Sequence, residues 1–320
     1  MKLFATVDEE YADFAAYAAD ESPSLAAWAR AVPADPETCA WLESLPVAKR
    51  QPNLVFAALR RHGADARDGW DVARGVLLER LAQVEHTVQS HATQTNEVGR
   101  LTSLMPLLGA IEGPVALLEA GASAGLCLYP DRYDYRWQGA GELRGSGGPL
   151  LECRASGPVP VPTRWPEVAW RGGVDLNPLD VDDPDDVDWL EALVWPEQDE
   201  RRDRLARAVE IARADPAHLH RGDLLETLPA LVEQAATYGT VVLFHSAVIA
   251  YLEPADRLRF DEMARGLVAA GACRWISNEG PDVLPSVTGQ GRGETGQFVL
   301  GLDGEPVAWS HGHGRSLTWL

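Results

Sequence analysis

One stretch of the chain, residues 114–126, constrains the fold more than any other. Its sequence is Pro-Val-Ala-Leu-Leu-Glu-Ala-Gly-Ala-Ser-Ala-Gly-Leu, an apolar run of strand length followed by Glu119 and a series of small residues. Gly121 and Gly125 allow the backbone to turn sharply out of a strand and allow a ligand to approach closely. We therefore expect a buried strand and a tight turn. Such a turn suits a nucleotide-binding loop, or the Gly-x-Ser-x-Gly elbow of serine hydrolases with Ser123 as nucleophile.

The residues before this stretch have the pattern of helices. Ser22-Pro23 and Asp35-Pro36 each place an N-cap residue before a proline, which is typical of a helix start. Apolar residues recur at helical spacing, and no segment alternates as a half-buried strand does. The expected helices cover residues 10–19, 52–61, 70–91 and 96–111. We expect an N-terminal helical domain, residues 1–111, that acts as a cap.

From residue 112 onward, short apolar runs alternate with amphipathic helices, the pattern of a mostly parallel sheet covered on both faces. The expected strands are residues 115–119, 173–176, 219–221, 240–245 and 273–277. Residues 297–302 and 305–310 flank Asp303-Gly304, which favours an antiparallel hairpin. We expect an α/β fold over residues 112–320, with a Rossmann-like, doubly wound sheet that this hairpin closes.

Residues 130–171 interrupt the alternation. The segment is rich in glycine and proline, and Tyr133, Tyr135 and Trp137 follow one another at the two-residue spacing of a strand. We expect a small antiparallel β insertion. It either covers the mouth of a site or forms a surface excursion with its own aromatic core.

The charge and the cysteines exclude several classes of function. The 320 residues include 28 Lys and Arg and 48 Asp and Glu, for a net charge of −20, which disfavours nucleic acids and anionic membranes as partners. The four cysteines are scattered, so neither a disulfide framework nor a thiolate metal site is expected. Residues 1–20 have acids where a signal peptide needs bases, and no apolar run has the ~18 residues of a membrane span. We expect a cytoplasmic protein without a membrane partner; the sequence indicates no oligomeric state.

The acidic and small residues at the strand ends resemble the core of class I S-adenosylmethionine-dependent methyltransferases. In that family the first strand ends in an acid and a glycine-rich turn, the second in an acid that binds ribose, and the third precedes a Gly-Asp pair near the adenine. Asp175 and Gly222-Asp223 match the second and third positions. The resemblance implies S-adenosylmethionine as the cofactor, held by Glu119, Gly121, Ser123, Gly125, Asp175 and Asp223.

Two features depart from that family's pattern. Ser123 stands where the middle glycine is usual, and about fifty residues separate the turn from Asp175, against ~20 in related nucleotide-binding folds. The insertion at residues 130–171 accounts for the extra length. The whole chain also resembles an uncharacterised bacterial family, through residues 94–100, 131–133 and 175–178 with the turn itself. This second resemblance implies no activity.

Four further residues are candidates for chemistry. His245 ends an expected strand on the side that lines the substrate in methyltransferases, so it is a candidate general base. The alternative is a hydrogen-bonded structural histidine. Asn96, Glu97 and Arg100 share one helical face and are candidate substrate contacts, with a polar contact between domains as the alternative. Arg100 favours an anionic group on the substrate.

Other polar residues have simpler explanations. Asp175 and Asp223 fall where open α/β sheets bind ligands, but each also fits a turn or N-cap acid. His311 and His313 have no third ligand nearby, and the aspartates of residues 180–188 lack the glycine and glutamate of a calcium loop. We therefore expect no metal site.

The function we expect is methyl transfer from S-adenosylmethionine to a small molecule by in-line displacement, with positioning as the main source of catalysis. One alternative is a non-catalytic ligand-binding protein on the same fold. Another is a serine hydrolase that uses Ser123. The hydrolase is disfavoured because only helices precede the expected first strand, whereas several strands precede a nucleophile elbow.

Overall fold

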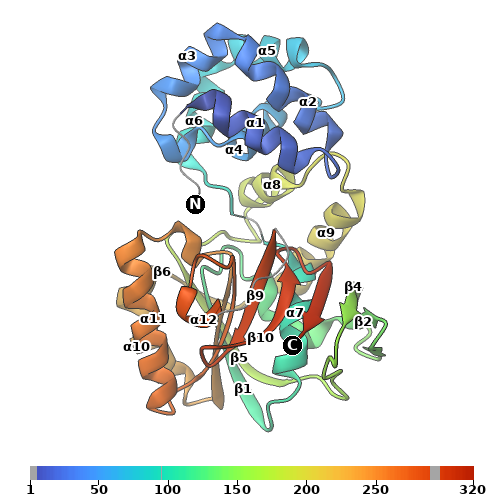
Figure 1. Ribbon diagram of the computed structural model, residues 1–320, viewed down its shortest axis with the longest axis vertical. Helices are drawn as coiled ribbons and strands as arrows, with labels where there is room; N and C mark the ends of the chain where they lie inside the picture. Colours follow the sequence, from blue (N-terminus) through green and yellow to red (C-terminus); the bar gives the residue numbers. More distant parts are fainter. Residues whose placement is uncertain (1–5, 95, 289–295) are drawn as a thin grey trace. The chain divides into compact units, whose positions relative to one another are not determined.

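The computed structural model describes residues 6–94, 96–288 and 296–320 (Figure 1). Contacts divide the chain into two compact units. Unit 1 comprises residues 1–95 and 182–205, and unit 2 comprises residues 96–181 and 206–320. The sequence pattern predicts a division at residues 111/112, and it does not predict that residues 182–205 belong to unit 1. In the described ranges, no helix has the length and apolar character needed to cross a membrane.

Unit 1 is helical. The side chains of Ser22 and Asp35 cap α2 and α3, each accepting the N–H group three residues further on, which confirms the two expected helix starts. The expected helix over residues 70–91 is instead two helices that break at Arg80, whose dihedral angles leave the helical region. The elements are α1 (Val7–Ala18), α2 (Pro23–Ala31), η1 (Val32–Ala34), α3 (Pro36–Ser44), η2 (Val47–Lys49), α4 (Pro52–Arg61), α5 (Trp70–Glu79), α6 (Leu81–Ser90), α8 (Pro184–Leu193) and the first part of α9 (Asp199–Ala214).

Aromatic rings fill the core of unit 1. Phe56 of α4 is fully buried and meets Trp28 and Tyr11 edge to face, with ring centroids 5.4 and 5.7 Å apart. Such pairs add stability beyond the area they bury. The core therefore forms around α4, with α1 and α2 packed on it.

Side chains of α4 hold α8 in unit 1. Arg60 Nη1 donates to the carbonyls of Ala192 and Val194, at 3.0 and 2.6 Å, and so satisfies the end of α8. The indole of Trp195 donates to Asn53 Oδ1 at 2.8 Å. Burial lowers the pKa of Arg60 to about 10. These bonds link residues more than a hundred positions apart, which is why sequence periodicity alone did not assign residues 182–205 to this unit.

Unit 2 contains a large, mostly parallel sheet, so the fold is mixed α/β. In the described part of the chain the strand order is β3-β2-β4-β11-β10-β9-β8-β7-β1-β5-β6. Six of the ten pairings among these strands are parallel and four are antiparallel. The strands are β1 (Pro114–Ala120), β2 (Asp134–Gln138), β3 (Gly141–Leu143), β4 (Leu150–Ser156), β5 (Glu167–Asp175), β6 (His218–Arg221), β7 (Thr240–Ser246), β8 (Arg274–Glu279), β9 (Gln297–Leu302), β10 (Glu305–His311) and β11 (Ser316–Trp319).

Two expectations about this sheet need correction. The segment 130–171 is not a separate antiparallel insertion, because β4 pairs in parallel with both β2 and β11, and only β2 and β3 are antiparallel. The hairpin of β9 and β10 does form, but it does not close the sheet. The chain continues into β11, a strand that was not expected from the sequence. One edge of β11 pairs with β10, and its other edge pairs with β4. The end of the chain thus joins the insertion to the main sheet.

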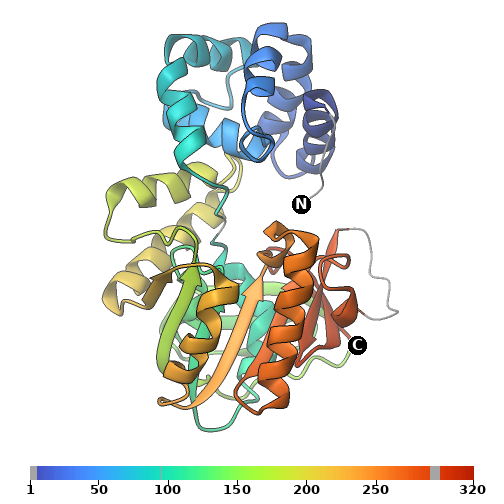
Figure 2. The same ribbon diagram turned by 90° about the vertical axis from the view of Figure 1, so that its left-hand side faces the viewer.

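Helices cover the sheet of unit 2. Residues of α10 (Leu224–Ala235) and α11 (Pro254–Ala269) share one apolar core with β1, β5, β7 and β8. In Figure 2 these two helices lie in front of the strands, and α7 (Leu101–Leu108) lies behind them. The remaining elements are η3 (Val98–Arg100), η4 (Leu126–Leu128), η5 (Pro130–Arg132), η6 (Ile249–Tyr251), α12 (Pro285–Thr288) and the second part of α9. The two faces of the sheet are called the α11 face and the α7 face below.

A buried arginine ties β5 to the segment after β1. Arg171 donates to both oxygens of Asp131, each at 2.8 Å, and to the carbonyl of Leu128 at 2.8 Å. Its Nε donates to Asp215 at 3.2 Å, and its guanidinium lies over the ring of Tyr129. Arg171 is only 8% exposed. The network therefore fixes the start of the segment that leads to β2.

Asp131→Asn should lower the free energy of unfolding by about 3–5 kcal/mol, because it leaves the Arg171 charge buried without its main partner. Urea denaturation measures this change. The exposed pair of Arg136 and Glu152, at 2.7 Å, provides the control. Glu152→Gln should cost no more than about 1 kcal/mol. Equal losses in the two variants would contradict the importance of the buried network.

Candidate functional site

The turn after β1 is held by main-chain bonds to β5. The N–H groups of Gly121 and Ala122 donate to the Val174 carbonyl, at 2.8 and 3.1 Å. Gly121 has a φ of +72°, and a Cβ at this position would lie 2.1 Å from Cγ2 of Val248. Glycine is required here so that Val248 can pack against the turn. The space beside Gly121 is therefore filled by Val248.

Ser123 adopts a left-handed backbone, with a φ of +50°, which is uncommon for a residue with a Cβ. Its N–H donates to Oδ2 of Asp175 at 2.8 Å, and Oδ1 of Asp175 accepts the N–H of Asn177 at 2.8 Å. The Ser123 hydroxyl is buried and has no hydrogen-bond partner among the described residues. Asp175 thus holds the turn in its strained shape.

Asn96 holds the turn from a second direction. Its Nδ2 donates to the Ala122 carbonyl at 3.0 Å, and its Oδ1 accepts the N–H of Leu126 at 2.8 Å. The amide nitrogen and the amide oxygen of Asn96 both bond to main-chain atoms of the turn, so Asn96 stabilises its conformation. Gly125, with a φ of +69°, lies within the braced segment. Thr95, part of the expected 94–100 segment, lies outside the described residues.

Glu119 is the acid at the end of β1, and it is 6% exposed. Its Oε2 has no hydrogen-bond partner among the described residues. Burial raises the pKa of this carboxyl well above its ordinary value. The positive charge of Arg100 opposes that shift, and the negative charge of Asp175 adds to it. Glu119, Arg100 and Asp175 are therefore close enough for their charges to interact.

Arg100 is the last residue of η3, directly before α7, and it is 9% exposed. Its Nε donates to the Gly312 carbonyl and its Nη1 to the Ser246 carbonyl, both at 2.9 Å. It forms no ion pair with Glu119 among the described residues. Glu97, also buried, accepts the N–H of Gly99 at 2.9 Å. Arg100 thus joins the start of α7 to the ends of β7 and β10.

His245 lies on the other face of the sheet. Leu118 and Leu243 belong to the core beneath α10 and α11, and side chains alternate along a strand. Glu119 therefore points to the α7 face. His245, two residues after Leu243, points to the α11 face, where its ring meets that of Phe260 with centroids 5.1 Å apart.

Both nitrogens of the His245 ring are engaged. Nε2 accepts the indole N–H of Trp275 at 3.1 Å, and Nδ1 lies 2.8 Å from Oε1 of Glu279. Because Nε2 is an acceptor, the proton lies on Nδ1 and is donated to Glu279. The expectation of a general base is corrected: His245 is fully buried, has no free nitrogen and does not share a face with Glu119.

Glu279, at the end of β8, is a residue that the sequence analysis missed. Its Oε1 also accepts the N–H groups of Val248 and Ile249, each at 3.0 Å. It holds the loop after β7, in which Ala247 has a left-handed φ of +59°. The available signal was an acid two residues beyond the expected strand 273–277, which is weaker than the acid that directly follows the apolar run before Glu119.

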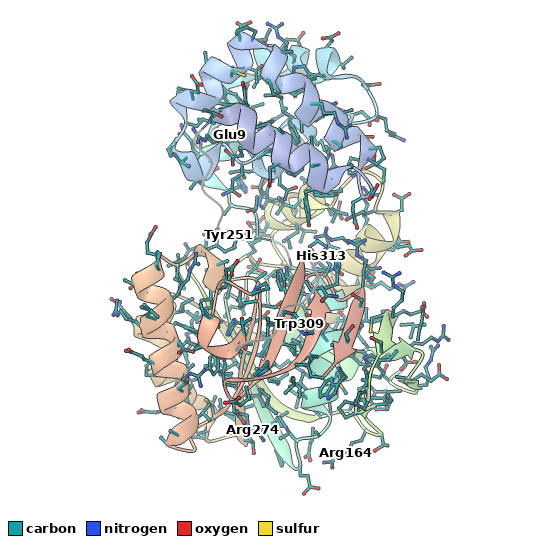
Figure 3. The ribbon with its side chains drawn as sticks, viewed as in Figure 1. Glu9, Arg164, Tyr251, Arg274, Trp309 and His313 are labelled. Atoms are coloured by element: carbon teal, nitrogen blue, oxygen red, sulfur yellow. The ribbon has the colours of Figure 1, made fainter. Side chains whose placement is uncertain are left out.

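The remaining candidates have local roles. Asp223 accepts the N–H of Leu225 at 2.8 Å and caps α10, as its alternative explanation predicted. His311 Nδ1 accepts the N–H of His313, which lies between β10 and β11 (Figure 3). Asp183 caps the start of α8. Within the described ranges, no group of three or more His, Cys, Asp or Glu residues could hold a metal ion.

No curated protein and no solved structure matches this chain. The model of one protein family, described as "Uncharacterized protein conserved in bacteria (DUF2332)", matches residues 8–319. The match confirms the resemblance of the whole chain to an uncharacterised bacterial family. With nearly its full length covered, the chain belongs to the DUF2332 family.

Proposed function

We propose that unit 2 is a Rossmann-like, doubly wound domain that binds a small molecule at the carboxyl ends of β1 and β7. Five parallel strands, β6-β5-β1-β7-β8, stand in the order third, second, first, fourth and fifth along the chain. Dinucleotide-binding folds share this order and bind ligands where it reverses. That point lies between β1 and β7. The role of residues 1–111 as a cap stays a prediction.

One observation carries the proposal: two buried polar groups at this point have no partner among the described residues. They are Oε2 of Glu119 and Oγ of Ser123. Buried polar groups are nearly always paired, and an unpaired one costs about 1–3 kcal/mol. A ligand that hydrogen-bonds to both would remove this cost.

Backbone strain gives separate support. Ser123 follows β1 and Ala247 follows β7, and both have left-handed backbones. Strain of this kind costs about 1–3 kcal/mol per residue and clusters at functional sites. Both strained residues flank the point where the strand order reverses.

The residues fit S-adenosylmethionine only in part. Glu119 and the turn occupy the positions that the methyltransferase resemblance implies. However, Val248 fills the space beside Gly121, and both oxygens of Asp175 accept main-chain N–H groups. A cofactor would have to displace Val248 and share Asp175. We therefore assign no methyl-transfer step to any residue, and S-adenosylmethionine is the first ligand to test.

A binding protein without its own catalytic base is the best-supported form of this proposal. The expected base, His245, is hydrogen-bonded at both nitrogens on the α11 face. A methyltransferase that works by positioning alone is the second candidate. The strand order and the acid-and-glycine turn favour it.

Glu119→Leu should raise the free energy of unfolding of the ligand-free protein by about 1–4 kcal/mol, because an apolar side chain replaces a buried, unpaired carboxyl. Urea denaturation measures the change. Glu142→Gln alters an exposed carboxyl and should stay within about 0.5 kcal/mol of wild type. A marked loss of stability in Glu119→Leu would show that the carboxyl supports the fold itself, against a role in binding.

Millimolar S-adenosylmethionine or S-adenosylhomocysteine should raise the melting temperature, because a ligand that binds only the native state stabilises it by mass action. Differential scanning fluorimetry measures the shift, which Glu119→Leu should lose and Glu142→Gln should keep. Val248→Ala opens the space beside Gly121 and should enlarge the shift. Gly121→Val is unsuitable, because its side chain would collide with Val248 in any state. No shift in wild type or in Val248→Ala would exclude this cofactor.

Ser123 should not react with a fluorophosphonate probe, because its hydroxyl is buried and no described base is bonded to it. Its left-handed backbone within Gly-x-Ser-x-Gly is the one feature that favours a hydrolase. Mass spectrometry of the intact protein checks for the adduct. Labelling that Ser123→Ala abolishes would put the hydrolase first among the candidates.

A further inference from the structure

The loop that follows β7 covers the turn that follows β1. Its residue Val248 lies so close to Gly121 that a Cβ on the glycine would be 2.1 Å from Cγ2 of Val248 and 2.7 Å from its Cβ. In dinucleotide-binding folds, a glycine in the turn after the first strand lets the ligand approach the main chain closely. In this structure the side chain of Val248 occupies that approach.

One oxygen of Glu279 holds the loop in this position. Oε1 accepts the N–H groups of Val248 and Ile249, each at 3.0 Å, and the Nδ1 proton of His245, at 2.8 Å. The other oxygen, Oε2, is buried and has no partner among the described residues. Hydrogen bonds to a charged acceptor are roughly twice as strong as those between neutral groups. The position of Val248 therefore depends on a single carboxylate oxygen.

Two residues of this loop lie between fixed points. Ser246 is fixed on one side, because its carbonyl accepts a hydrogen bond from Arg100 at 2.9 Å. Ile249 is fixed on the other side, because its side chain is fully buried in the core beneath α10 and α11. Ala247 and Val248, between them, are only partly buried. A rearrangement of the loop is therefore confined to these two residues.

The conformation of Ala247 is strained. Its φ of +59° lies in the left-handed region, which is costly for a residue with a Cβ. Its N–H donates to the Asn278 carbonyl at 3.1 Å, and the Val248 carbonyl accepts the N–H of Tyr251 at 3.0 Å. A rearrangement would break these bonds and the bond from Val248 to Glu279, but it would release the strain. The two conformations therefore differ less in free energy than the number of bonds implies.

We propose that Ala247 and Val248 form a gate over the candidate site. Glu279 holds the gate closed, and a ligand reaches Gly121 only when Val248 moves away. This inference rests on the proposed function, because the gate controls access to the same site. It adds a means of regulating that site, and it makes Glu279 a positioning residue that acts through the loop without touching the ligand.

Amide hydrogen exchange of the full chain, resolved to single residues by NMR spectroscopy, tests whether the gate opens. The N–H groups of Val248 and Ile249 are bound to the same oxygen at the same distance, so Ile249 is the internal control. After correction for intrinsic rates, Val248 should exchange faster than Ile249 by about tenfold or more, because a group that opens locally is less protected than a group of the core.

Glu279→Gln keeps the shape of the side chain and an acceptor oxygen but removes the charge. It should raise the exchange rate of Val248, relative to that of Ile249, roughly three- to tenfold, because the bond to residue 279 loses its charge-assisted part. Glu142→Gln alters an exposed carboxyl and should leave this ratio unchanged. Ala247→Asn should lower the ratio, because asparagine tolerates the left-handed backbone. This variant leaves Glu279 in place, so it tests the gate even if Glu279→Gln does not fold.

A ligand that lies against Gly121 holds the gate open. Millimolar S-adenosylmethionine should therefore speed the exchange of Val248 while it slows that of Ile249, because binding stabilises the native state as a whole. Its affinity should be higher in Glu279→Gln than in wild type, because a larger fraction of that variant is competent to bind.

Three results would overturn the inference. Equal protection of Val248 and Ile249 in wild type would mean that the gate opens only when unit 2 unfolds. A ratio that Glu279→Gln leaves unchanged would mean that Glu279 does not hold the gate. Slower exchange of Val248 with S-adenosylmethionine bound would mean that the ligand binds to the closed form, and the proposed function would stand without the gate. Conversely, a gate that opens in a protein whose melting temperature S-adenosylmethionine does not change would support the inference and remove only that cofactor.

Discussion

The end of β1 depends on side-chain oxygens that come from other segments. A tight turn leaves its N–H groups without the partners that a helix or a sheet supplies. Asp175 accepts the N–H of Ser123, and Asn96 accepts that of Leu126 while donating to the Ala122 carbonyl. These bonds fix the left-handed residue, and Glu119 sits at the strand end from which the turn departs. The geometry of the candidate site therefore follows from how this main chain is satisfied.

The loop after β7 is built in the same way on the opposite face. Oε1 of Glu279 accepts two N–H groups of the loop and the proton of His245 Nδ1, and the loop contains the left-handed Ala247. Val248 of this loop fills the space beside Gly121. The two turns thus restrain one another across neighbouring parallel strands. A change at Glu279 would reach Gly121 through packing, without any contact between the two residues.

Patterns within one segment were predictable from the sequence, and contacts between distant segments were not. The caps of α2 and α3 and the strand that ends in Glu119 follow from neighbouring residues and were expected correctly. The return of α8 to unit 1 depends on Arg60 and Asn53, and the joining of β4 to β11 depends on an edge more than a hundred residues away. The periodicity of apolar residues within one segment does not predict which distant segment it contacts. The prediction that His245 is a general base was wrong for the same reason, because its partners Trp275 and Glu279 lie on another strand.

Two buried glutamates show why strand position alone does not identify a site. Glu119 lies next to the last residue of β1 and Glu279 is the last residue of β8, so their positions at strand ends do not separate them. In the fold, one oxygen of Glu279 accepts three hydrogen bonds, which satisfy a loop and a buried imidazole. Glu119 has an unpaired oxygen and a guanidinium nearby that is bound elsewhere. Both carboxyls thus have an Oε2 that is unpaired among the described residues, but Oε1 of Glu279 has partners within the protein that explain its position. For the Glu119 carboxyl no hydrogen bond is described at all, so it is costly to bury as it stands, and the function proposed above would supply the missing interaction through a ligand.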